Sequence, residues 1–241
     1  MMSLRPTLLA LALAAASLTH AAEPAASPEP APTVTAASTE AAPTPPADPV
    51  QTGLAAIQGR WAEIQYQTPA DQRADAFEAL AAEAGRFKDA NPGRAEPLIW
   101  EGIVLSTWAG AKGGLSALGL CKDARADFEA ALKLDPQALQ GSAYTSLGSL
   151  YYQVPGWPIG FGDDDRAEEL LKQALAIAPD SIDANYFYGD YLIDQGRYAE
   201  AVTVLAHAQT AAPRPGRELA DQGRQQEIAG KLAQARAKVR S

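Results

Sequence analysis

Apolar and small residues recur at intervals of three to four positions through residues 51 to 241, which is the period of an amphipathic helix. Prolines interrupt this pattern at Pro92, Pro136, Pro179 and Pro213, and a helix does not continue through a proline. No run of Val, Ile or Thr shows the alternation of a strand. The pattern therefore predicts an all-α domain of about four helical hairpins. They cover residues 51–92, 95–136, 139–179 and 182–213.

Small and large residues in the last hairpin follow a known repeat. Pro179 and Pro213 stand 34 residues apart, and the segment between them fills the positions of a tetratricopeptide (TPR) repeat. These positions are Gly189, Leu192, Gly196, Tyr198, Ala201, Leu205 and Ala208. The chain from Ala124 to about Gly216 resembles the TPR superfamily, and the part from Gln51 to Ala124 resembles it more weakly. The resemblance implies a right-handed, TPR-like α-solenoid.

The register of the second hairpin has two explanations. Gly102 matches the small position that Gly148 and Gly189 fill in later hairpins, but Glu101 then falls on an apolar position. Burying a carboxylate without a partner is costly. Either Glu101 is a buried acid, or the register is shifted by a residue or two. We favour the shift, because Trp100 is otherwise poorly placed.

The C-terminal segment predicts a capping helix over residues 216–239. Its thin apolar stripe would cover the last hairpin, while Arg224, Lys231 and the glutamines near them would face water. Residues 214–241 carry seven basic and three acidic side chains, whereas residues 22–213 carry 26 acidic and 12 basic ones. The basic end suits either an acidic partner or membrane surface, or a solvated helix face. We favour the solvated face.

The N-terminal region has the pattern of an export signal. Arg5 precedes an apolar run from Leu8 to Leu18, and small residues lead to a cleavage site after Ala21, so residues 1–21 predict a signal peptide. The run is too short for a stable membrane anchor, and no lipoprotein cysteine follows it. Residues 22–50 contain eight prolines and no aromatic residue, which predicts a disordered linker. We expect a periplasmic or secreted protein.

Candidate catalytic residues are few. His207 is the only histidine after the predicted signal and is expected to face solvent, and the lone Cys121 is expected to be a buried apolar residue. Asp163, Asp164 and Asp165 suit a helix start better than a calcium site. The sequence therefore predicts a protein that is not an enzyme and has no metal or cofactor. Its acidic body argues against nucleic acid as a partner.

Two insertions lengthen the turns within the second and third hairpins. The second insertion, between Gly148 and Ala167, carries Trp157, Ile159 and Phe161 among prolines and glycines. These three side chains are too apolar to prefer water, so we expect the loop to pack down on the hairpin. Any part that stays exposed would be an anchor for a partner.

The resemblance also implies a binding face. In TPR proteins the first helices of the hairpins line a concave groove, and the matching residues here are Thr145, Ser149, Tyr152, Gln153, Asp183, Tyr186, Asp190, Ile193 and Asp194. A groove that mixes tyrosines with aspartates suits an extended peptide with some positive charge. The alternative is that Tyr152 and Tyr186 only pack against neighbouring helices.

One branch of exported TPR proteins is the most similar. The segment from Ser142 to Tyr151, followed by Pro155-Gly-Trp-Pro158 and Gly162-Asp-Asp, resembles the TPR family associated with TRAP transporters. That family implies a periplasmic partner of transporter substrate-binding subunits, or a carrier of small apolar ligands. Our leading hypothesis is a protein- or peptide-binding adaptor, with a small-ligand auxiliary of such a transporter as the alternative.

Overall fold

A computed structural model describes residues 48–240 of the chain. The predicted signal peptide and the linker up to residue 47 lie outside the described residues. The linker prediction is wrong for its last two residues, because α1 (Pro49–Gln67) begins at Pro49. The Asp48 side chain caps this helix by accepting a hydrogen bond from the Val50 backbone nitrogen at 3.0 Å, and Pro49 suits the first helical position.

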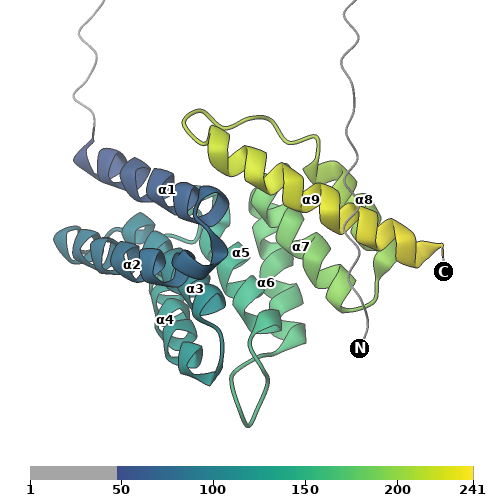
Figure 1. The fold of residues 1–241 in the computed structure, drawn as a ribbon, viewed down its shortest axis with the longest axis horizontal. Coiled ribbons are helices and arrows are strands. Elements are labelled where there is room, and N and C mark those ends of the chain that lie inside the picture. Colours follow the sequence, from purple (N-terminus) through teal and green to yellow (C-terminus); the bar gives the residue numbers. More distant parts are fainter. Residues whose placement is uncertain (1–47, 241) are drawn as a thin grey trace, which may run out of the picture. The chain divides into compact units, whose positions relative to one another are not determined.

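The described residues form four helical hairpins and one further helix (Figure 1). The hairpins are α1 with α2 (Arg73–Ala90), α3 (Ala95–Lys112) with α4 (Leu118–Leu134), α5 (Ala138–Gln153) with α6 (Asp164–Ile177), and α7 (Ile182–Asp194) with α8 (Tyr198–Ala208); the last helix is α9 (Glu218–Val239). Two short 3-10 turns, Ala70–Gln72 and Leu115–Ala117, precede α2 and α4. Within residues 48–240 the only strand-like feature is a single bridge between Gly156 and Gly162. The prediction of an all-α solenoid is confirmed.

One close contact recurs in all four hairpins. A glycine of the first helix lies against a large side chain of the second, so that an added Cβ would come within 2.8 Å of that side chain. The pairs are Gly53 with Phe87, Gly102 with Phe128, Gly148 with Leu171, and Gly189 with Leu205. The first hairpin, whose likeness to the repeat was weak in sequence, therefore packs as the others do.

The contact of Gly102 with Phe128 settles the register of the second hairpin. Glu101 keeps its apolar position, and only 13% of its side chain is exposed. Lys88 of α2 forms an ion pair with Glu101 and a second one, at 3.2 Å, with Asp127 of α4. Our preference for a shifted register was wrong, because this lysine supplies the partner that a buried carboxylate needs.

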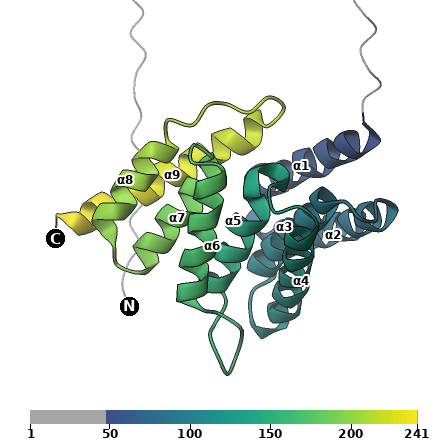
Figure 2. The same ribbon diagram turned by 180° about the vertical axis from the view of Figure 1, so that it is seen from behind.

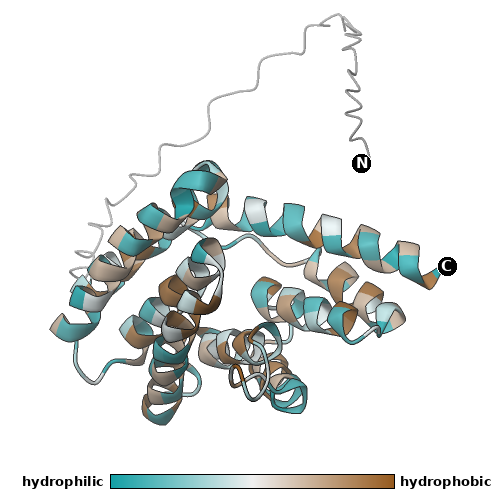
Figure 3. Ribbon diagram, turned by 60° about the horizontal axis from the view of Figure 1, so that its bottom comes forward, coloured by the Kyte–Doolittle hydropathy of each residue, from teal (hydrophilic) through white to brown (hydrophobic). Residues whose placement is uncertain are grey.

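Helix α9 does more than cap the last hairpin. It packs against α8 and α7 and also reaches α1 (Figures 1 and 2). At α1, Gly223 lies against the Tyr66 ring. Ile228 and Leu232 are its fully buried anchors. Most of the rest of its ribbon is hydrophilic (Figure 3). The chain thus joins its first hairpin to its last helix. No helix among the described residues has the length and apolar character that crossing a membrane requires.

The loop between α5 and α6 projects from the hairpin (Figures 1 and 2). The prediction that its apolar side chains pack down is wrong for two of the three. Trp157 is 90% exposed and Ile159 is 57% exposed, while Phe161 is half-buried against Tyr151 at a ring distance of 5.6 Å. The cause lies at the neck of the loop. A Cβ on Gly162 would lie 1.9 Å from the Val154 carbonyl oxygen, so the two chain segments touch and hold the tip away from the helices.

Candidate ligand-binding pocket

A pocket of about 360 Å³ lies on the side of the solenoid formed by the first helices of the hairpins. α1, α3, α5 and α7 all contribute side chains, and the remaining wall comes from the segment that leads into α9 and from the first turns of α9. This volume is within the range of small-molecule sites. The pocket is therefore what remains of the predicted concave groove once α9 is in place.

The start of α5 shapes one wall. Leu139, Gln140 and Gly141 have φ values of 48°, 59° and 73°, so the chain makes a left-handed turn before the regular helix begins. Leu139 and Gln140 both line the pocket. Left-handed conformations cost energy for residues with a side chain, and residues strained in this way cluster at functional sites. This turn is a second reason to regard the pocket as the functional site.

Aromatic side chains form the apolar part of the pocket. Trp61 and Tyr66 come from α1, Trp100 from α3 and Phe187 from α7. The Trp61 ring meets the rings of Tyr66 and Trp100 edge to face, at centroid distances of 5.9 and 6.1 Å. Trp61 donates its indole hydrogen bond to the Thr107 hydroxyl at 3.0 Å, which fixes its orientation. The three rings thus give a rigid, mainly apolar surface.

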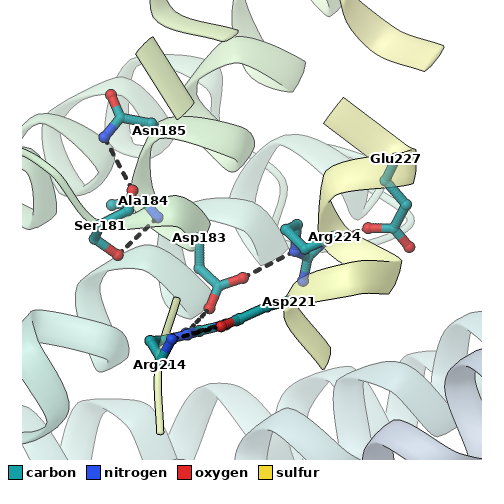
Figure 4. Close-up of polar contacts among 8 residues, drawn as sticks. All are labelled: Ser181, Asp183, Ala184, Asn185, Arg214, Asp221, Arg224 and Glu227. Carbon is teal, nitrogen blue, oxygen red and sulfur yellow. Dashed lines mark hydrogen bonds and ion pairs between the residues drawn. The ribbon is translucent and has the colours of Figure 1, made fainter. Parts of the chain in front are cut away.

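Arginines from the other wall meet at Asp183 (Figure 4). Arg214 and Arg224 donate to its two carboxylate oxygens at 2.7 and 2.8 Å. Arg214 also pairs with Asp221, and Arg224 with Glu227. Burial acts to raise the pKa of Asp183, but the charges of Arg224 and Arg214 outweigh it and lower that pKa to about 2.

The position of Arg224 differs from the sequence prediction. It was expected on the wet side of the last helix, yet it is 8% exposed and its guanidinium lies 4.3 Å from the centre of the Tyr186 ring. The same group lies 4.9 Å from the Phe187 ring. Asp183 makes the burial of Arg224 possible by pairing with its charge, and the guanidinium of Arg224 also forms cation–π contacts with the Tyr186 and Phe187 rings.

A second set of predicted groove residues also contacts α9. Lys231 forms an ion pair with Asp190 at 2.5 Å, so this lysine does not belong to a purely solvated face either. Tyr152 donates to the other oxygen of Asp190 at 2.9 Å, and Gln153 donates to the Tyr152 hydroxyl at 3.0 Å. Asp183, Tyr186 and Asp190, which were predicted to receive a basic peptide, are therefore engaged by the chain's own basic helix.

The structure divides the predicted site residues into four groups. Thr145, Ser149 and Asp183 line the pocket. Tyr186 and Asp190 contact α9, and Tyr152 donates a hydrogen bond to Asp190. Ile193 is a buried core residue. Gln153 and Asp194 are exposed. The nine residues thus do not form one continuous open surface.

Several pocket residues escaped the sequence analysis. Trp61 and Trp100 have the spacing of core residues, and nothing local marks them as lining a cavity. The excess of basic charge in residues 214–241 was the one feature of the sequence that could have indicated the pocket arginines, Arg214, Arg217 and Arg224. We had interpreted that excess as a helix face exposed to solvent.

The candidate catalytic side chains lie elsewhere. Cys121 is buried in α4, and burial raises the pKa of its thiol. His207 is an exposed residue of α8 whose Nε2 lies 3.0 Å from an Asp180 oxygen. Asp163 caps α6 by accepting from the Arg166 backbone nitrogen at 3.0 Å, as predicted. Within residues 48–240 no group of three or more His, Cys, Asp or Glu side chains is placed to hold a metal ion.

Comparison with known proteins agrees with this architecture. Residues 159–222 match the tetratricopeptide repeat family. A thermophilic TPR protein from Thermus thermophilus is 21% identical, with a TM-score of 0.52 over 78% of this chain and 91% of its own. Two structures of MamA, one of them of the AMB-1 protein, are each 19% identical at a TM-score of 0.40. They cover 70% and 73% of this chain and 92% and 98% of their own. No curated protein sequence matches the chain.

Proposed function

We propose that this tetratricopeptide-repeat protein is a non-enzymatic periplasmic adaptor that binds a protein partner through a short segment held in the pocket. The TPR fold is a scaffold for protein–protein interaction. The observation that carries the proposal is the pocket itself. It joins aromatic rings, hydroxyl groups and arginines from five helical elements in one cavity. Such convergence of apolar and polar groups is typical of a binding site.

The occupied groove limits the kind of segment that binds. Because α9 contacts Asp183, Tyr186 and Asp190, a long extended peptide has no free path along the first helices. A terminus or a single projecting side chain fits the remaining volume. The exposed Trp157 and Ile159 provide a second, separate contact for the same partner.

The proposal also includes export of the protein to the periplasm. The signal-like residues 1–21 support a periplasmic location, and the likeness of the third hairpin to TPR proteins of TRAP transporters makes a substrate-binding subunit a candidate partner. Cleavage after Ala21 would leave Ala22 as the first residue. N-terminal sequencing of the protein from a periplasmic fraction tests this, and an intact Met1 would contradict export by a cleaved signal.

Pocket-dependent capture of a partner tests the adaptor role. Ser146 lines the pocket and is half-buried, so Ser146→Phe would fill part of the cavity. We expect this variant to lose the partner that wild type retains from a periplasmic extract, while Lys122→Gln on the exposed side of α4 retains it. The same set of captured proteins with both variants would contradict the proposal.

A carrier of small ligands for a TRAP-type transporter is the second candidate. The pocket volume favours it, since about 360 Å³ accommodates a complete small molecule. Native mass spectrometry of protein purified without denaturant would then show an added mass. That mass would be absent from Ser146→Phe. If wild-type protein shows only the mass of the polypeptide under the same conditions, the result would count against this function.

A further inference from the structure

Two hydrogen-bond donors in the pocket have no partner among the described residues. The Tyr66 hydroxyl and the Arg217 Nε are both buried and form no hydrogen bond. Buried side-chain polar atoms without a partner are rare, and each calls for a physical explanation. Both belong to side chains that line the same cavity, and a bound group that accepts hydrogen bonds would supply the partner that each donor lacks.

Among the described residues, Arg217 is also a cation that forms no ion pair with a carboxylate. The three nearby acids of the described chain are already engaged: Asp183 with Arg214 and Arg224, Asp221 with Arg214, and Glu227 with Arg224. Burial and the neighbouring charge of Arg214 lower the pKa of Arg217, because both destabilise its charged form. An anion in the pocket would relieve both the unpaired charge and the missing hydrogen bond.

The surroundings of Arg217 indicate what the anion is attached to. Its guanidinium lies 5.2 Å from the centre of the Trp100 ring, and Trp100 in turn meets Trp61. A ligand whose charged end reaches Arg217 therefore has its body beside two indole rings. Flat or branched apolar groups are the ones that gain most from such a surface.

We propose that the pocket binds an organic carboxylate with an aromatic or branched apolar body. Arg217 binds the carboxylate, Trp61 and Trp100 contact the body, and the Tyr66 hydroxyl donates to a second acceptor. This inference rests on the proposed function, because it assigns the ligand of the same pocket. The carboxylate belongs either to a free small acid or to the C-terminal residue of a partner, and both sources present the same chemistry.

The test compares probes that differ only in charge. Thermal unfolding and isothermal titration are measured with phenylacetate and phenylacetamide, and with the peptide Gly-Gly-Phe bearing a free or an amidated C-terminus. We expect the free carboxylates to bind at millimolar concentration or better and to raise the melting temperature, while the amides do not. Binding of the free peptide identifies a partner terminus as the source, and binding of phenylacetate alone identifies a free acid.

Two arginine variants locate the site. Arg217→Met keeps an apolar stem over Trp100 but removes the charge, and we expect it to weaken carboxylate binding about tenfold or more. Arg236→Met, at the exposed end of α9, serves as the matched control and should bind as wild type does. Equal binding of acid and amide by wild type, unchanged affinity in Arg217→Met, or no binding of any carboxylate would each overturn the proposal.

These outcomes are distinct from those of the adaptor test. If Ser146→Phe loses its partner but acids and amides bind alike, the pocket is the functional site and the carboxylate assignment is wrong. If carboxylates bind through Arg217 while partner capture does not depend on Ser146, the adaptor role is wrong and the small-ligand function remains.

Discussion

At the scale of single residues, the distance between α7 and α8 depends on the absence of a side chain at Gly189. A Cβ on Gly189 would lie 2.5 Å from Leu205 Cγ, a separation that requires the leucine or the helix to move. We expect Gly189→Ala to lower the free energy of unfolding by about 1–3 kcal/mol, although alanine favours helix. Gly110→Ala in α3 is the control, since its Cβ would meet nothing within 4 Å. Urea denaturation measures both, and equal stability of the two variants would contradict the contact.

The buried carboxylates around Lys88 give a prediction for pH. Burial and the charge of Glu101 raise the pKa of Asp127 to about 6, in spite of the opposite effect of Lys88. The folded protein therefore keeps a proton on Asp127 that the unfolded chain releases near pH 4. This group's contribution to stability is present below pH 4 and is lost as the pH rises to about 6.

Asp127→Asn removes that titration. Between pH 4.5 and 7.5 we expect the free energy of unfolding of Asp127→Asn to rise relative to wild type by about 1–2 kcal/mol. Asp89→Asn, which removes an exposed charge from the same region, is the control. The measurement is urea denaturation at the two pH values. A difference between Asp127→Asn and wild type that does not change with pH would contradict the raised pKa.

At the scale of elements, α9 is an integral part of the fold. Ile228 is completely buried, whereas Val239 near the end of the same helix is 53% exposed. We expect Ile228→Ala to cost about 2–4 kcal/mol, because it leaves a cavity in the core that α7, α8 and α9 share. Val239→Ala should change the stability by less than about 0.5 kcal/mol. Thermal and urea unfolding compare the two, and a small effect at Ile228 would mean that α9 is only loosely docked.

The same helix marks the limit of what could be predicted from the sequence. Prolines and the period of small residues specify the hairpins, because helix ends and the contact of Gly189 with Leu205 depend on residues close together in the chain. The pocket depends instead on the approach of Gly223 to Tyr66, which are far apart in the chain and carry no local pattern. For the same reason Arg224 looked solvated, since only Asp183 makes its burial favourable.

At the scale of the whole molecule, contact between α1 and α9 changes how the solenoid unfolds. In an open solenoid each repeat contacts only its neighbours, and the ends separate from the middle on unfolding. Here the contact of Gly223 with Tyr66 connects α9 to the first hairpin, and Arg217, the residue that precedes α9, lies beside Trp100 of the second hairpin. We therefore expect wild type to unfold in a single transition.

Gly223→Ala tests this coupling. Its Cβ would lie 2.4 Å from the Tyr66 ring, so α9 and α1 must move apart, at a cost of about 1–3 kcal/mol. All four tryptophans precede α6, so fluorescence reports on the first three hairpins while circular dichroism reports on every helix. In wild type the two probes should give one urea midpoint, and in Gly223→Ala they should separate. Gly230→Ala, an open position of the same helix, should keep a common midpoint. Separate midpoints already in wild type would show that the contact does not couple the two ends.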